Sequence, residues 1–124
     1  MPRYVILRHE GSATYQPGVH WDLMLEMAGA LRTWALAELP TAARPIAAQP
    51  LPDHRLAYLD YEGPITGDRG SVAHWDEGEF DVLSESPDEL AISLAGDQLR
   101  GRATLSRGGA ADANWTFIFS PAGV

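Results

Sequence analysis

The sequence contains no cysteine, and this absence restricts the chemistry available to the protein. Disulfide bonds, thiolate metal ligands and thiol nucleophiles are all excluded. Any bound metal ion would have to be held by histidine and carboxylate side chains, which suit divalent manganese, zinc or iron. The residues to consider first as ligands are therefore the four histidines, His9, His20, His54 and His74.

Lysine is also missing, so the nine basic residues are all arginines, and they face 17 acidic residues for a net charge of −8. Proteins that bind duplex DNA usually carry a basic surface that replaces the counterions of the phosphates. We therefore expect weak binding to duplex DNA. A site for a phosphate group would need a local cluster of arginines.

The chain has no apolar run of membrane-spanning length, and its first residues, MPRYVILRHE, lack the pattern of a signal peptide. These absences predict a cytoplasmic protein with no membrane partner. With 124 residues, of which 45% are hydrophobic, the chain is long enough to bury a core. We expect residues 1–124 to form one domain.

Short runs of alternating or β-branched residues recur along the chain, whereas helical periodicity never persists beyond about three turns. This pattern predicts a mainly β protein, a small antiparallel β-barrel in which helix is confined to short turns. The expected strands are residues 3–9, 20–27, 31–37, 71–80, 89–95, 98–106 and 114–120.

Other segments carry separate expectations. Residues 38–53 include four prolines, which predict an irregular loop packed on the domain. The acidic run over residues 76–81 predicts a solvent-exposed hairpin, and His74 is expected at the surface. Core positions are expected for the four tryptophans, Trp21, Trp34, Trp75 and Trp115, because they lie within strand patterns.

The run VHWDLMLE over residues 19–26 alternates polar and apolar side chains. Successive side chains of a strand point to opposite faces, so His20 and Asp22 share one face, about 7 Å apart along the strand. An imidazole and a carboxylate at this spacing can converge on one metal ion. His9 is the best placed residue to complete the ligand set, and Glu26 is expected to be structural or to accept a hydrogen bond from a ligand histidine.

Several ordered segments resemble one known family. They are HWDLMLEMAGALRTWALAELP, DHRLAYLDYEG, WDEGEF, LRGRATLSR and WTFIF. No single segment is specific, but the ordered set is similar to the 3′-phosphoesterase domain of bacterial end-joining DNA ligase D and to its free-standing relatives. The resemblance implies a compact β-barrel that removes 3′-phosphates or 3′-ribonucleotides from DNA ends, with a phosphate ester as substrate.

The resemblance also implies site residues. A divalent metal, typically manganese, with zinc as an alternative, would be held by His9, His20 and Asp22. Two further residues, His54 and Tyr58, match the family's residues at the scissile phosphate. A protonated histidine can stabilise phosphoryl charge or protonate a leaving oxygen, and a tyrosine hydroxyl can donate to a phosphate oxygen.

Two positions depart from the family pattern. Met24 stands where the family has a phosphate-binding arginine, and Glu38 stands where it has a lysine. These departures weaken the expected anion site and predict a reduced or altered activity. A cation could be restored from another position by one of the arginines Arg8, Arg32, Arg55 or Arg69.

Two alternatives remain open from the sequence. One is a non-catalytic metal-binding or partner-binding module that keeps the fold and the ligand trio, and the departures at Met24 and Glu38 favour it. The other is a non-haem iron(II) enzyme, whose facial triad would recruit His54 or His74 as a third ligand. That reading fits poorly, because such enzymes need a larger barrel than 124 residues allow.

Overall fold

A computed structural model describes residues 2–12, 18–40, 44–65, 67, 69–109 and 113–122. Over these residues the protein is almost entirely antiparallel β-structure with one short 3-10 helix, which confirms the predicted mainly β fold and its small helical content. The elements in chain order are β1 (Arg3–Glu10), β2 (Val19–Met27), β3 (Ala30–Leu36), β4 (Ile46–His54), η1 (Leu56–Leu59), β5 (Gly63–Pro64), β6 (Ser71–Ser86), β7 (Glu89–Gly96), β8 (Arg100–Ser106) and β9 (Trp115–Pro121).

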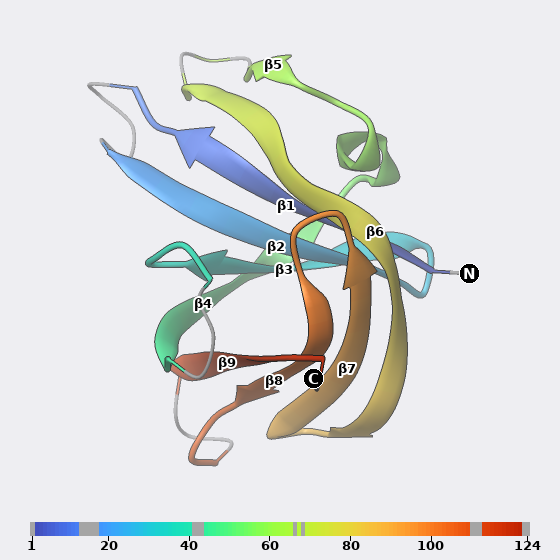
Figure 1. Cartoon of the computed structure of the whole chain (residues 1–124). Coiled ribbons are helices and arrows are strands. Elements are labelled where there is room, and N and C mark those ends of the chain that lie inside the picture. Colours follow the sequence, from blue (N-terminus) through green and yellow to red (C-terminus); the bar gives the residue numbers. More distant parts are fainter. Residues whose placement is uncertain are drawn as a thin grey trace.

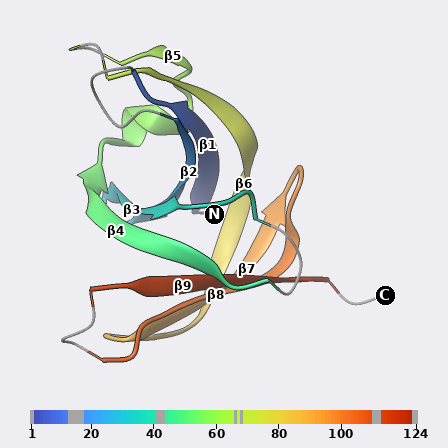
Figure 2. The ribbon, with the colours of Figure 1, turned by 90° about the vertical axis from the view of Figure 1, so that its left-hand side faces the viewer.

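Eight of the strands form a closed ring in the order β1-β2-β3-β4-β9-β8-β7-β6, and β6 pairs back onto β1 (Figures 1 and 2). The short strand β5 pairs with the start of β6. Closure depends on β6, which pairs with β1 along its first half and with β7 along its second half. Figure 1 shows β6 as a long curved strand that runs from beside β5 down to the hairpin with β7.

The side-chain alternation of β1 and β2 builds two separate apolar clusters. One face of these strands contributes Tyr4, Ile6, Leu23 and Leu25 to the main core, which also takes buried residues from β3, β4 and β6–β9. The opposite face contributes to a smaller cluster made of Val5, Leu7, Met24, Leu31, Leu59 and Val72. The helix η1 supplies Leu59 and so covers this second face.

The expectation that residues 38–53 form a loop is wrong for the second half of the segment. Residues 46–54 form β4, which pairs with β3 over Ala48–His54 but with β9 only over Ile46–Ala48. Proline is tolerated in strands that lack a hydrogen-bonding partner on one side. Pro50 and Pro52 both lie in the part of β4 that has lost β9 as a neighbour, so they do not interrupt a ladder there.

The expected exposed hairpin at residues 76–81 is also wrong. Asp76 is only 2% exposed, and its carboxylate accepts hydrogen bonds from the Tyr4 hydroxyl at 2.5 Å and from the backbone amides of Gln98 and Leu99. The β1–β6 register explains this burial. Asp76 pairs with Ile6 and His74 pairs with Leu7, so an extra residue bulges between them and turns Asp76 toward the core.

The tryptophans largely follow expectation. Trp34 and Trp115 are buried in the main core, while Trp21 and Trp75 pack against it and stay partly exposed. No helix among the described residues is both long enough and apolar enough to cross a membrane.

Candidate metal centre and active-site pocket

The pairing of β1 with β2 brings three candidate ligands together. His9 lies directly opposite His20 in the antiparallel register, and Asp22 follows two residues later on the same face of β2. His9 Nδ1 lies 3.1 Å from His20 Nε2 and 3.4 Å from Asp22 Oδ2. His20 Nε2 lies 3.1 Å from Asp22 Oδ1. One ligand atom from each residue falls within a 4.8 Å cluster, a geometry suited to one shared cation.

The orientation of the His9 ring is fixed by a backbone contact on the side of the ring opposite to the cluster. Its Nε2 lies 2.9 Å from the carbonyl oxygen of Arg69, so Nε2–H donates to this oxygen and Nδ1 presents a lone pair to the cluster. The neighbouring Gly70 makes this approach possible. A Cβ atom there would lie 1.9 Å from the carbonyl oxygen of Glu10, and its φ of +88° is one that glycine adopts without strain.

His9 and Asp22 are buried, His20 is half-buried, and the charges of the three residues interact. Burial alone would raise the pKa of Asp22, but hydrogen bonds and charge interactions with His20 and His9 outweigh it and hold that pKa below its usual value. The pKa of His9 is raised, first by its hydrogen bond to Asp22 and further by the Arg69 carbonyl, against the opposing effect of burial. An anionic carboxylate between two imidazoles is a donor set that attracts a divalent cation.

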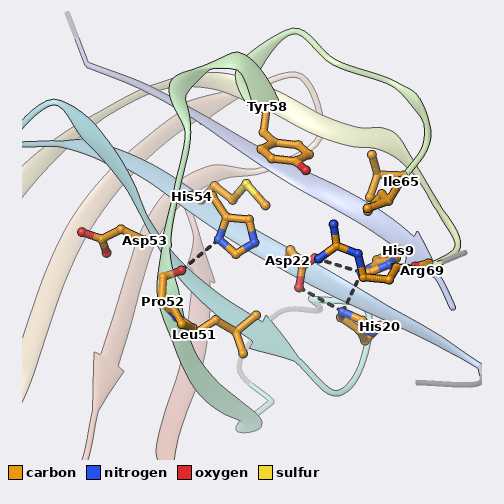
Figure 3. A pocket seen from close by; sticks show the side chains of 12 residues that line it. His9, His20, Asp22, Leu51, Pro52, Asp53, His54, Tyr58, Ile65 and Arg69 are labelled. Atoms are coloured by element: carbon orange, nitrogen blue, oxygen red, sulfur yellow. Dashed lines mark hydrogen bonds and ion pairs between the residues drawn. The ribbon is translucent and has the colours of Figure 1, made fainter. Parts of the chain in front are cut away.

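A pocket of about 300 Å³ opens above these three residues (Figure 3). His54, the last residue of β4, and Tyr58, in η1, line its opposite wall. The Nδ1 of His54 lies 2.9 Å from the Pro52 carbonyl oxygen, and Figure 3 shows the rest of the ring turned into the pocket, toward Asp22. The Tyr58 ring packs edge-on against His54 at a centroid distance of 5.6 Å. The structure therefore brings all five sequence-predicted site residues to one pocket.

The two departures from the family pattern lie in different places. Met24 lines the pocket, but its side chain is 1% exposed and belongs to the small apolar cluster beneath it. Glu38 is not among the pocket-lining residues, and it makes an ion pair of 2.8 Å with Arg44. Glu38 therefore places no acidic side chain in this pocket.

Of the four arginines considered as replacement cations, Arg69 alone lines this pocket. Arg8 pairs with Glu10, and Arg32 pairs with Glu85 while lying over the Trp34 ring. Arg55 lines a neighbouring pocket instead. Figure 3 shows the Arg69 side chain reaching into the pocket on the side of Asp22 and His9.

The remaining candidates from the sequence do not join the centre. His74 is largely buried rather than at the surface, because it lies on β6 beside β1, and its Nδ1 is 3.4 Å from a Glu77 carboxylate oxygen. Glu26 accepts a hydrogen bond from the Arg3 backbone amide, which agrees with a structural role. Among the described residues, the metal-ligating cluster contains neither His54 nor His74, so the iron triad that would recruit one of them is not formed, although two histidines and one carboxylate are a donor set that iron(II) enzymes also use.

Comparisons with known proteins agree with the resemblance. Residues 9–107 match the model of the DNA ligase D 3′-phosphoesterase domain family. The chain is 33% identical to the multifunctional non-homologous end joining protein LigD of Pseudomonas aeruginosa, in an alignment of 116 residues. That alignment covers 85% of this chain and 13% of the relative, so the chain spans only a small part of that protein's length. The chain belongs to the DNA ligase D 3′-phosphoesterase domain family.

Proposed function

We propose that this protein is a divalent-metal-dependent phosphoesterase that heals 3′ ends of DNA by removing a 3′-phosphate or a 3′-ribonucleotide. The observation that carries the proposal is the convergence of His9, His20 and Asp22 on the floor of a pocket whose opposite wall holds His54 and Tyr58. A metal centre facing an acid–base residue across a pocket of about 300 Å³ is an arrangement suited to phosphate ester hydrolysis.

The ligand set fits a divalent metal. Two imidazoles and one carboxylate suit manganese or zinc, and they leave coordination positions for water and a phosphate oxygen. The buried carboxylate of Asp22 faces the ring nitrogens of His9 and His20 at 3.4 and 3.1 Å, and a cation held by the three residues would balance its charge. When bound, the metal would neutralise phosphate charge and activate water.

His54 is the residue we assign to proton transfer. Its Nδ1–H donates to the Pro52 carbonyl, which leaves Nε2 available to the pocket. In the protonated ring, Nε2–H can give its proton to the 3′ oxygen as the bond from that oxygen to phosphorus breaks and water oxygen bonds to phosphorus. Tyr58 lies beside His54, and its hydroxyl can donate to a non-bridging phosphate oxygen.

Arg69 is the residue we assign to the phosphate charge. Met24 offers no charge, and Glu38 is paired with Arg44 elsewhere. The guanidinium of Arg69 reaches the same pocket from the segment that also orients His9. A guanidinium can bind two phosphate oxygens at once, so one arginine can replace much of the missing positive charge.

The decisive experiment is an activity screen with short DNA strands that end in a 3′-phosphate or a 3′-ribonucleotide. Manganese is expected to support release of the terminal group, a chelator to abolish it, and strands with a 5′-phosphate to remain intact. A generic phosphodiester serves as a further control. Binding of manganese without turnover of any substrate would favour the non-catalytic metal-binding module instead.

A further inference from the structure

A row of aromatic rings leads away from the proposed catalytic pocket. His54 contacts Tyr58 at 5.6 Å between ring centroids, and Tyr58 contacts Tyr61 at 5.9 Å, both in edge-on geometry. A second pocket of about 270 Å³ lies along this row. It shares Tyr58 and Ile65 with the catalytic pocket, so the two pockets are contiguous. The remaining lining residues of the second pocket are Arg55, Ala57, Tyr61 and Pro64.

Tyr61 is held in place although its side chain is exposed. Its hydroxyl donates to the Pro64 carbonyl oxygen, and the edge contact with Tyr58 supports the ring from the other side. Gly63 sits at φ +130°, where a Cβ atom would lie 3.3 Å from the Tyr61 hydroxyl oxygen. Tyr61 nevertheless remains 39% exposed. A pre-positioned aromatic ring of this kind can accept a stacked base at a small cost in conformational entropy.

Arg55 gives the second pocket its charge. The residue is exposed, and within the described part of the chain its guanidinium makes no ion pair or hydrogen bond. Other arginines, such as Arg3 and Arg107, are paired with Asp60 and Asp88. The protein has a net charge of −8, so an unpaired guanidinium beside aromatic rings is unusual in it. A phosphate can bind this guanidinium without first displacing a carboxylate from it.

We propose that the pocket around Arg55 and Tyr61 binds the nucleotide that precedes the 3′-terminal one in a single-stranded DNA end. Its base stacks on the Tyr61 ring, and its phosphate pairs with Arg55. The assignment rests on the proposed function, because it takes the 3′ terminus to lie in the pocket lined by His9, His20 and Asp22. A single strand is favoured over a duplex because the face of a base is free to stack on a side chain only when the base is not enclosed in a helix.

A third pocket, of about 500 Å³, borders the catalytic pocket at His20 and Leu51, but it fits a strand less well. Its lining is dominated by alanines and includes no arginine. Such a surface provides neither a cation for the phosphate nor an exposed aromatic row. The charged and aromatic pocket at Arg55 and Tyr61 is therefore the better path for the strand.

The test measures binding separately from turnover. Fluorescence anisotropy with 5′-labelled single strands of one to six nucleotides that end in a 3′-hydroxyl is expected to show tighter binding from one to two or three nucleotides. Tyr61→Ala and Arg55→Ala should each remove this gain, with at least a fivefold weaker Kd for the longer strands, the lower end of what one stacked base contributes. Tyr61→Phe should retain binding, because the ring remains.

Arg102→Ala is the charge-matched control, because Arg102 is exposed on β8 and lines none of the three pockets described above. It should bind strands as the wild type does. Arg55→Ala should also reduce the salt dependence of binding by roughly one phosphate contact. Unchanged thermal unfolding and manganese affinity in each variant would show that the fold and the metal centre persist.

The two proposals fail in different ways. Length-dependent binding that is lost in the Tyr61 and Arg55 variants, without hydrolysis of any 3′ end, supports the strand site and contradicts the phosphoesterase function. Hydrolysis with equal kcat/KM on a nucleoside 3′-phosphate and on a longer strand overturns the strand site alone. Equal affinity of wild type and Tyr61→Ala for strands, or equal affinity for a blunt duplex and a single strand, also overturns it.

Discussion

His9 and His20 occupy directly paired positions on neighbouring antiparallel strands, and their ring nitrogens approach to 3.1 Å. The centre is thus created by strand pairing rather than by a loop. Residues on paired strands keep their spacing because the backbone ladder fixes it, so the ligand geometry is set before any ion binds.

Removal of the carboxylate should weaken metal binding most clearly. We expect Asp22→Asn to lower manganese affinity by at least about tenfold, because the carboxylate charge is lost and a neutral amide oxygen is a weaker ligand. Even changes to residues that only contact a metal ligand cost about tenfold in affinity. Isothermal titration calorimetry would measure the change. Asp53→Asn is the matched control, since Asp53 is an exposed acid that lines the same pocket outside the ligand cluster. Equal affinity in wild type and Asp22→Asn would reject the assignment.

Removal of the His54 imidazole should reduce the rate of hydrolysis without changing the affinity for the metal. We expect His54→Ala to reduce turnover of 3′-phosphate ends at least about a hundredfold, within the range attributed to general acid–base catalysis. Manganese affinity should not change, because His54 lies outside the ligand cluster. Single-turnover assays and titration of the same preparation measure both quantities. Full activity in His54→Ala would show that another group moves the proton.

A substitution at Arg69 should distinguish the role of its side chain in phosphate binding from the role of its backbone carbonyl in orienting His9. Its carbonyl oxygen accepts the His9 hydrogen bond, so Arg69→Ala retains this contact while it removes the guanidinium. We expect kcat/KM for 3′-phosphate ends to fall about tenfold to a hundredfold, the value of a charge-assisted hydrogen bond, with unchanged manganese affinity. Arg69→Lys should recover part of the loss. If Arg69→Ala retains the wild-type kcat/KM, the Arg69 guanidinium does not bind the phosphate.

The buried pair Tyr4–Asp76 should control stability at high pH. Burial, followed by the hydrogen bond to Asp76 and the charge of that carboxylate, raises the pKa of Tyr4 above its reference value of 10.0. A group whose pKa is raised by folding contributes stability that is complete below its unfolded pKa and is lost as the pH rises beyond it. The free energy of unfolding should therefore fall above about pH 10.

Tyr4→Phe tests this contact. The variant should be less stable by about 1.5–3 kcal/mol at neutral pH, because the buried carboxylate loses its hydroxyl donor and keeps only the two backbone amides. It should also show a shallower loss of stability above about pH 10. Urea denaturation followed by tryptophan fluorescence would measure both. Parallel pH profiles for the two proteins would contradict the assignment.

Blunt duplex DNA should bind poorly. The net charge of −8 opposes association with a polyanion, and the arginines Arg3, Arg8, Arg32, Arg44 and Arg107 are each paired with an acidic side chain. We expect a Kd weaker than about 10⁻⁸ M at physiological salt, outside the range of specific DNA binders, and a further loss as salt is raised. Tighter binding would reveal a basic surface that outweighs the total charge.

Local sequence pattern accounted for part of the site and missed the rest for identifiable reasons. The alternation over residues 19–26 placed His20 and Asp22 on one face, because side-chain direction in a strand depends only on position parity. His9 was predicted as the third ligand, but its position directly opposite His20 depends on the register between β1 and β2, which the alternation of side chains does not show. The same holds for Arg69, which reaches the pocket through a return of the chain after β5 and was only one of four candidate arginines.

The errors in the fold have a related origin. Prolines in β4 argue locally against a strand, yet the topology leaves that part of β4 without a second neighbour and removes the objection. Asp76 belongs to an acidic run that is typical of a solvated surface. A bulge in β6 nevertheless turns Asp76 inward, where Tyr4 and two backbone amides satisfy it. Both outcomes are set by long-range pairing rather than by composition.

The two faces of β1 and β2 determine which substitutions can alter the pocket without altering the main core. Residues of one parity, such as Ile6 and Leu23, belong to the main core, whereas residues of the other parity, such as His9 and Asp22, belong to the pocket. Substitutions at the polar pocket positions of β1 and β2 can therefore alter the site while the main-core positions of the same strands stay constant. Met24 lies on the same face of β2 as His20 and Asp22 and lines the pocket, so laboratory evolution of new substrate preferences could begin from this position.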